Sequence, residues 1–153
     1  MLALNFPAYQ FKLTQSPKGL QIFDIVRKKK VLLTPEEWVR QHVLHFLNAE
    51  KEVPMGLMAV EQGIKLHGMQ RRCDIVIYNT HGIPAMIVEC KAPTVKISQD
   101  IFDQIARYNL VLKVDYLLVT NGLQHICCQI DHTTSNYAYL PTIPSFSSIN
   151  KAI

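Results

Sequence analysis

The feature that most constrains the fold of this chain is a pair of apolar runs joined by a short polar turn. The runs cover residues 73–78 and 84–91, and Asn79-Thr80-His81-Gly82 between them is typical of the bend of a hairpin. Both faces of the two predicted strands are apolar, which indicates a sheet whose two faces are both covered. Other elements are therefore expected on each side of this hairpin.

Two helices are predicted from their capping residues. Thr34 is a favourable N-cap, followed by Pro35 at the first helical position, for a helix that reaches about Asn48 and buries one apolar stripe. Ser98 can cap a second helix that reaches about Leu112. The long connection through this second helix suits a crossover between parallel strands.

Three further strands are predicted, over residues 57–66, 114–120 and 125–130. In the first of them apolar residues alternate, so one face is expected to carry Met58, Val60, Ile64 and Leu66. The other two flank Asn121-Gly122 and are expected to pair with each other. The order of helix, three strands, helix and two strands predicts an α/β fold with a central mixed sheet between helices.

The 153 residues fit a single domain with three parts. Residues 1–33 are expected to form an N-terminal arm with short strands, and residues 34–131 the core. Residues 132–153 are predicted to be an irregular tail, because Pro141 and Pro144 limit regular structure. With 48% apolar and 18% charged residues, the composition excludes a disordered or fibrous chain.

Composition and short motifs narrow the possible functions. The net charge of +4 permits a polyanionic partner without demonstrating one. Cys73, Cys90, Cys127 and Cys128 lack the spacing of a zinc site and are expected to be buried, reduced thiols. No GxxxxGKS or GxxxxGKT sequence is present, so a nucleotide-driven motor would have to sit on another chain. No signal peptide or bilayer-spanning run is recognisable, and a cytoplasmic location is expected.

The predicted hairpin brings three charged side chains together. A bend centred between His81 and Gly82 sets Asp74 opposite Glu89, with Cβ atoms about 4.5–5.5 Å apart. Because side chains alternate along a strand, Lys91 emerges on the same face as Glu89. Two carboxylates suit Mg²⁺ or Mn²⁺, and an ammonium group beside them can stabilise charge, so the pattern favours metal-assisted phosphodiester hydrolysis. A network of ordinary edge charges is the alternative.

Other polar residues could join this site or serve structure alone. Gln104 and Tyr108 lie one turn apart on one face of the second predicted helix. Glu36 and Glu37 either supply a further acid or only interact with the helix dipole. The remaining candidates are basic side chains that either bind phosphates or are simply solvated: Arg71, Arg72, Lys96, Arg107 and the run Arg27-Lys28-Lys29-Lys30.

Five segments, taken in order, resemble the N-terminal nuclease domain of type I restriction enzyme R (HsdR) subunits, which belongs to the PD-(D/E)XK nuclease superfamily. They are Thr34-Pro35-Glu36-Glu37-Trp38-Val39-Arg40-Gln41, Arg72-Cys73-Asp74-Ile75-Val76, Val88-Glu89-Cys90-Lys91-Ala92-Pro93, Gln104-Ile105-Ala106-Arg107-Tyr108-Asn109 and Thr120-Asn121-Gly122. The resemblance covers roughly residues 30 to 130. The ordered set is far more specific than any one segment.

This resemblance implies a restriction-endonuclease-like α/β/α core and a set of site residues. Asp74, Glu89 and Lys91 match the metal-binding and catalytic positions, and a glutamate of the first helix, with Glu37 as the first choice, completes the metal site. Gln104 and Tyr108 match the Gln-x-x-x-Tyr element of the family.

The function implied is that of a Mg²⁺- or Mn²⁺-dependent endonuclease acting on DNA. Motor or specificity subunits on separate chains are the implied partners, no membrane is involved, and an oligomer is compatible with the sequence. The alternative is a catalytically silent subunit that binds nucleic acid or assists a restriction or repair complex. The choice between DNA and RNA stays open at this point.

Overall fold

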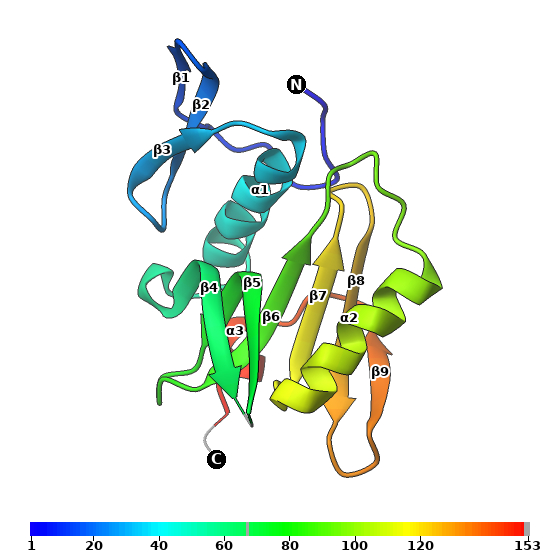
Figure 1. The fold of residues 1–153 in the computed structure, drawn as a ribbon. Coiled ribbons are helices and arrows are strands. Elements are labelled where there is room, and N and C mark those ends of the chain that lie inside the picture. The colour runs from blue at the N-terminus through cyan, green and yellow to red at the C-terminus, as the bar shows by residue number, and fades with distance from the viewer. Residues whose placement is uncertain (67, 152–153) are drawn as a thin grey trace.

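The computed structural model describes residues 1–66 and 68–151 of the chain. Six strands form one mixed sheet in the order β4-β5-β6-β7-β8-β9, and three shorter strands form a separate N-terminal sheet, β1-β2-β3 (Figure 1). The large sheet comprises β4 (Met58–Leu66), β5 (Met69–Tyr78), β6 (Pro84–Cys90), β7 (Tyr116–Thr120), β8 (His125–Asp131) and β9 (Asn136–Leu140). The predicted α/β fold with a mixed sheet is confirmed.

Helices cover both faces of the large sheet. Helix α1 (Pro35–Ala49) is capped by Thr34, whose side chain accepts a hydrogen bond from the amide of Glu37. Helix α2 (Gln99–Leu112) is capped in the same way by Ser98. The apolar stripe of α1 packs on one face of β5, β6 and β7, and that of α2 packs on the other face. This burial on both sides explains why the strands carry apolar residues on both faces.

The central hairpin has the predicted register. Ile75 pairs with Val88 and Ile77 with Met86, so the next pair outward is Asp74 with Glu89. The register shifts only between Ile77 and Tyr78, beside the bend. Strands β6 and β7 are parallel, as expected for a crossover through α2. The register therefore places both predicted acids at the same end of the hairpin.

Strand β4 departs from the predicted alternation. Met58 and Val60 pack on the α1 face of the sheet, but Ile64 packs on the α2 face. Glu61, which lies between them, has a φ of 53°, in the left-handed region. The expectation of a single apolar face is therefore wrong for Ile64, because the left-handed conformation of Glu61 reverses the side-chain alternation. The side chain of Leu66, predicted on the same face, lies outside the described part of the structure.

Strand β5 changes face at the level of its acidic residue. Cys73 packs on the α2 face and Ile75 on the α1 face, although they are two residues apart. Their partners across the sheet are Gln62 and Val60, so the pairing register with β4 is kept on both sides of the change. Asp74 therefore lies where both strands are irregular.

The C-terminal part is more regular than predicted. Residues 132–153 were expected to be irregular, but β9 pairs with β8 along its whole length and a short helix, α3 (Phe146–Ile149), follows. Ile143 and Ile149 are buried in the same core cluster as the apolar stripe of α1. Pro141 and Pro144 lie after β9, so they end the sheet without preventing its last strand.

The N-terminal arm is anchored to the core. Its three strands are β1 (Leu13–Ser16), β2 (Gly19–Asp24) and β3 (Lys29–Leu32), next to the start of α1 (Figure 1). The chain before them is held by a hydrogen bond of 2.8 Å from the Trp38 indole to the Leu2 carbonyl and by one of 2.7 Å from the Asn5 amide to the Gly122 carbonyl. The arm is thus packed on the domain.

The cysteine prediction is confirmed, because all four thiols are free and buried. Burial raises the pKa of Cys73 to about 11 and keeps these thiols protonated. Among the described residues, no helix has both the length and the apolar character that a membrane crossing requires.

Gly122 generates a stability prediction, because its φ of 86° is unfavourable for other residues and a Cβ there would lie 2.9 Å from Leu4. Gly122→Ala should lower the free energy of unfolding by about 1–3 kcal/mol, measured by urea denaturation. Gly56→Ala is the control, since a Cβ at Gly56 meets nothing within 4 Å. Equal midpoints for the two variants would contradict this account.

Candidate active site

Two carboxylates, from Asp74 and Glu89, lie together at the end of the β5–β6 hairpin. Asp74 Oδ2 accepts a hydrogen bond of 2.7 Å from the backbone amide of Cys90, which directly follows Glu89. The proximity of the Asp74 carboxylate favours the protonated form of Glu89. The hairpin register therefore brings the two predicted acids close together.

Glu89 is buried, and burial is the main reason that its pKa rises from the ordinary 4.5 to about 7. The nearby Asp74 carboxylate raises the pKa further, whereas Arg71 and Lys91 lower it. Arg71 Nη2 forms an ion pair with Glu89 Oε1. Glu89 is therefore a buried acid whose negative charge is only partly compensated.

Lys91 continues the line of β6 by one residue. Its backbone amide donates a hydrogen bond of 2.8 Å to the Thr120 carbonyl on β7. The positive charge of Lys91 lowers the pKa values of both Glu36 and Glu89. The ammonium group is thus close enough to influence Glu89 and the start of α1.

The two glutamates of α1 have different surroundings. Glu37 is only 5% exposed, and its carboxylate accepts hydrogen bonds from Arg27, Arg40 and Gln41. The pKa of Glu36 is raised mainly by burial and secondarily by the negative charge of the nearby Asp74 carboxylate. Glu36 and Glu37 both line an open cavity of about 500 Å³, together with Ala92, the residue after Lys91. Glu36 is therefore better placed than Glu37 to join the acidic pair.

Helix α2 reaches the site through Tyr108. The guanidinium carbon of Arg71 lies 4.7 Å from the centre of the Tyr108 ring, a cation–π arrangement. Arg71 Nη1 is buried and has no hydrogen-bond partner in the described structure. Gln104 is exposed on the same helix and makes no side-chain hydrogen bond to the acids in the described part of the chain. Tyr108 thus touches the site through Arg71, whereas Gln104 stands at its edge.

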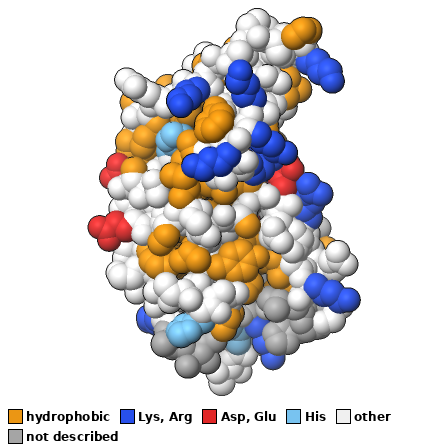
Figure 2. All heavy atoms as spheres, turned by 90° about the vertical axis from the view of Figure 1, so that its left-hand side faces the viewer, with side chains coloured by type: hydrophobic (Ala, Val, Ile, Leu, Met, Phe, Trp, Pro, Cys, Tyr) orange, Lys and Arg blue, Asp and Glu red, His pale blue; other side chains and the backbone are white. Residues whose placement is uncertain are grey.

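The other predicted basic residues lie on the surface. Arg72 is 73% exposed at its side chain and binds Glu61 at 3.0 Å, and Lys96 and Arg107 are exposed. In the basic run, Lys28, Lys29 and Lys30 are exposed on the N-terminal sheet. Figure 2 shows one face of the molecule, with lysine and arginine side chains gathered over its upper part. Figure 1 places the N-terminal sheet and α1 at this height.

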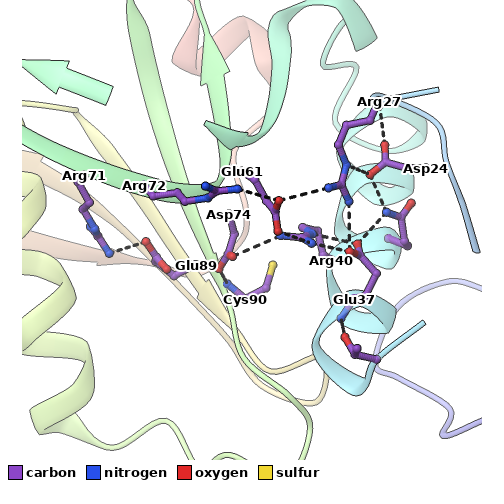
Figure 3. A network of polar contacts seen from close by, with 12 residues as sticks. Asp24, Arg27, Glu37, Arg40, Glu61, Arg71, Arg72, Asp74, Glu89 and Cys90 are labelled. Carbon is purple, nitrogen blue, oxygen red and sulfur yellow. Dashed lines mark hydrogen bonds and ion pairs between the residues drawn. The ribbon is translucent and has the colours of Figure 1, made fainter. Parts of the chain in front are cut away.

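A buried network of ion pairs adjoins the acidic pair (Figure 3). Sequence reasoning did not single out its members Asp24, Arg40, Gln41 and Glu61, and treated Arg27 only as part of the basic run. Arg40 and Gln41 follow Glu37 by three and four residues, the spacing at which helix side chains meet. This spacing could have indicated, from the sequence alone, the contacts of Glu37 with Arg40 and Gln41.

The chemistry of the donor set fits a divalent cation. Asp74, Glu89 and Glu36 supply hard oxygen atoms of the kind that Mg²⁺ and Mn²⁺ prefer. In the described residues, no group of three His, Cys, Asp or Glu side chains is arranged as a ready metal site. The pKa of Glu89 is raised mainly by burial and further by the Asp74 carboxylate, and a cation at the pair would offset both effects. Arg71 pairs with Oε1 of Glu89 in this structure.

Comparisons with known proteins agree with this description. A family model described as type I restriction enzyme R protein N terminus (HSDR_N) matches residues 35–144. The fold is similar to the solved structure of a fragment described as an HsdR subunit of a type I restriction enzyme from Vibrio vulnificus YJ016, with a TM-score of 0.54 and 21% identity. The likeness covers 76% of this chain and 24% of that chain, so this chain spans about a quarter of its length. No curated protein matches this sequence.

Glu89 provides a direct test of the site's electrostatics. Its carboxyl carbon, followed by NMR, should titrate near pH 7, well above the ordinary 4.5. Between these two values the folded state binds the proton more tightly than the unfolded state, so this group makes the fold less stable as pH rises.

Asp74→Asn should lower the Glu89 midpoint by removing a negative neighbour, and Arg71→Met should raise it by removing a positive one. A wild-type midpoint at the ordinary glutamate value, or shifts of the same sign in both variants, would contradict this description.

Proposed function

Because this chain belongs to the family of type I restriction enzyme R protein N-terminal regions, we propose that it is a metal-dependent endonuclease of PD-(D/E)XK type that hydrolyses DNA phosphodiester bonds. The observation that carries the proposal is the proximity of Asp74 and Glu89 at a strand end, with Lys91 close enough to influence Glu89. A structural ion pair needs one acid and one base. Two adjacent acids raise each other's energy unless a cation is bound, so a metal-binding role explains their proximity.

Asp74, Glu89 and Glu36 would hold Mg²⁺ or Mn²⁺, with Glu36 in place of the Glu37 expected from the sequence. The ion would supply polarisation of the phosphoryl group and activation of a water molecule. The Lys91 ammonium would stabilise the negative charge that develops on the phosphate. Tyr108, with Gln104 beside it, would limit the orientation of Arg71 at the edge of the site.

Arg71 would exchange partners during the reaction. It neutralises Glu89 in the absence of a ligand, and its second nitrogen is buried without a partner. A phosphate oxygen is a suitable acceptor for such an arginine fork. We therefore assign Arg71 to the phosphate of the substrate once a cation compensates Glu89.

The remaining contacts with DNA would be electrostatic. Exposed basic side chains would bind phosphates without reading bases: Lys28, Lys29, Lys30, Arg72, Lys96 and Arg107. Binding should therefore weaken steeply as salt concentration rises. Four free cysteines suit a reducing compartment, which supports a cytoplasmic site of action.

Two further aspects of the proposal concern other chains and the alternative function. Motor or specificity subunits are the proposed partners, because the matching family model describes the R protein of type I restriction enzymes. A catalytically silent, nucleic-acid-binding subunit is the second candidate. It is favoured by one observation, the ion pair in which Arg71 already occupies Glu89.

The decisive experiment compares metal binding with turnover in three variants. Duplex, single-stranded and branched DNA are incubated with Mg²⁺ or Mn²⁺, and metal affinity is measured by calorimetry. Asp74→Asn and Glu89→Gln should lose both metal binding and cleavage, because each removes a charged oxygen ligand. Lys91→Ala should keep metal binding and lose cleavage by about 10²- to 10³-fold, the effect of deleting one preorganised charge-stabilising group.

Lys113→Asn is the matched control, because it removes an exposed lysine at the left-handed C-cap of α2, where asparagine is well tolerated. It should leave cleavage unchanged. DNA binding without cleavage by the wild-type protein under every metal condition would favour the silent subunit. Unchanged cleavage in Lys91→Ala would overturn the proposed role of that residue.

A further inference from the structure

A chain of ion pairs connects the N-terminal sheet to Asp74. Figure 3 shows it running from Asp24 and Arg27 through Glu37 and Arg40 to the acidic pair. Its members come from four elements that are far apart in the sequence, namely the end of β2 with the turn after it, α1, β4 and β5. The chain of contacts therefore connects elements that no local motif would connect.

The outer end of this network is Asp24, the last residue of β2, which is 0% exposed. Its Oδ1 accepts hydrogen bonds from the amides of Val26 and Arg27, and its Oδ2 accepts them from the side chains of Arg27 and Gln41 at 2.8 and 2.9 Å. Burial opposes the ionised form of Asp24, but these hydrogen bonds outweigh it and lower the pKa. Asp24 is thus a fixed anion that orients Arg27.

The middle of the network is Glu37 with its two arginines. Arg27 Nη2 lies 3.2 Å from Glu37 Oε1, and Arg40 binds both oxygens of the same carboxylate. Arg27 and Arg40 also reach Glu61 at the irregular point of β4, at 3.5 and 3.3 Å. Burial disfavours the charged form of Arg40, yet its acidic neighbours raise its pKa above the ordinary value. Arg40 therefore remains charged and has a defined orientation.

The inner end is Asp74. Its Oδ1 lies 3.5 Å from Arg40 Nη1, while its Oδ2 accepts the hydrogen bond from the Cys90 amide. One oxygen is thus held from α1 and the other from β6. This matters because β5 changes face around Asp74, so regular strand geometry does not fix the direction of that side chain.

We propose that Arg40 is a positioning residue for Asp74, and that the N-terminal sheet, acting through Asp24 and Arg27, forms part of the candidate active site. Arg27 lies on the far side of Glu37 and Arg40 from Asp74. Removing the Arg27 charge leaves the buried carboxylates of Asp24 and Glu37 with less compensating positive charge. The rearrangement that costs the least free energy is then a movement of Arg40 toward these two acids and away from Asp74. The catalytic consequence rests on the proposed function, whereas the structural coupling does not.

The test replaces Arg27 with Met and measures hydrogen exchange at the Cys90 amide by NMR. That amide donates to Asp74, so its protection reports how firmly Asp74 is held. Exchange should become about tenfold faster relative to Leu118, a fully buried apolar residue of the neighbouring strand β7. In the cleavage assay kcat should fall while KM for DNA stays close to the wild-type value.

Companion variants separate coupling from general destabilisation. Arg40→Lys keeps the positive charge but loses the two-pronged guanidinium group, so it should also raise the ratio of Cys90 to Leu118 exchange rates. Combining it with Arg27→Met should raise this ratio little further, because both variants act through the same contacts. Arg27→Lys replaces Arg27→Met if the latter does not fold, and Lys113→Asn should leave the ratio unchanged. Melting temperatures identify any variant that is only unstable.

A Cys90-to-Leu118 ratio that stays at the wild-type value in the folded Arg27 and Arg40 variants overturns the inference. A raised ratio in a protein that cleaves no DNA supports the positioning network and counts only against the proposed nuclease activity. A raised ratio with lowered kcat supports both.

Discussion

The arrangement of this molecule depends on two carboxylates, Asp74 and Glu89, placed side by side at a strand end and largely withdrawn from water. Burial, and further the nearby Asp74 carboxylate, disfavour the charge of Glu89 and raise its pKa to about 7. Positive groups offset this cost from two directions, Arg71 for Glu89 and Arg40 for Asp74. The neighbouring acids and arginines can be understood as the means by which these two cations are held.

The fold supplies the positions that this electrostatic arrangement needs. Helices on both sides of the sheet bury the hairpin, so its open end is where charged side chains can reach solvent. The irregularity shared by β4 and β5 brings Glu61 and Asp74 toward α1, within reach of Arg40. The N-terminal sheet then closes the network through Arg27. The irregularity of β4 and β5 is therefore what allows their acidic residues to form ion pairs with Arg40.

Much of this could be predicted from the sequence, because the hairpin register and both helix caps depend on short-range patterns. Strand β9 was missed because Pro141 and Pro144 were taken to limit regular structure in this segment, although both lie after the strand. The face change at Glu61 was missed because alternation was assumed to continue through a left-handed φ. The choice between Glu36 and Glu37 needed the tertiary position of Arg27, which no local spacing reveals. Long-range ion pairs are thus the part that sequence patterns specify least.

The most direct test of a metal-binding acidic pair is anomalous X-ray diffraction from crystals grown with Mn²⁺ at a pH above 7, where Glu89 is ionised. The account predicts an anomalous peak bonded to Asp74 and Glu89, with the Arg71 guanidinium released from Glu89. Diffraction that shows no ion at the pair, with Arg71 still bound to Glu89 at saturating Mn²⁺, would contradict it.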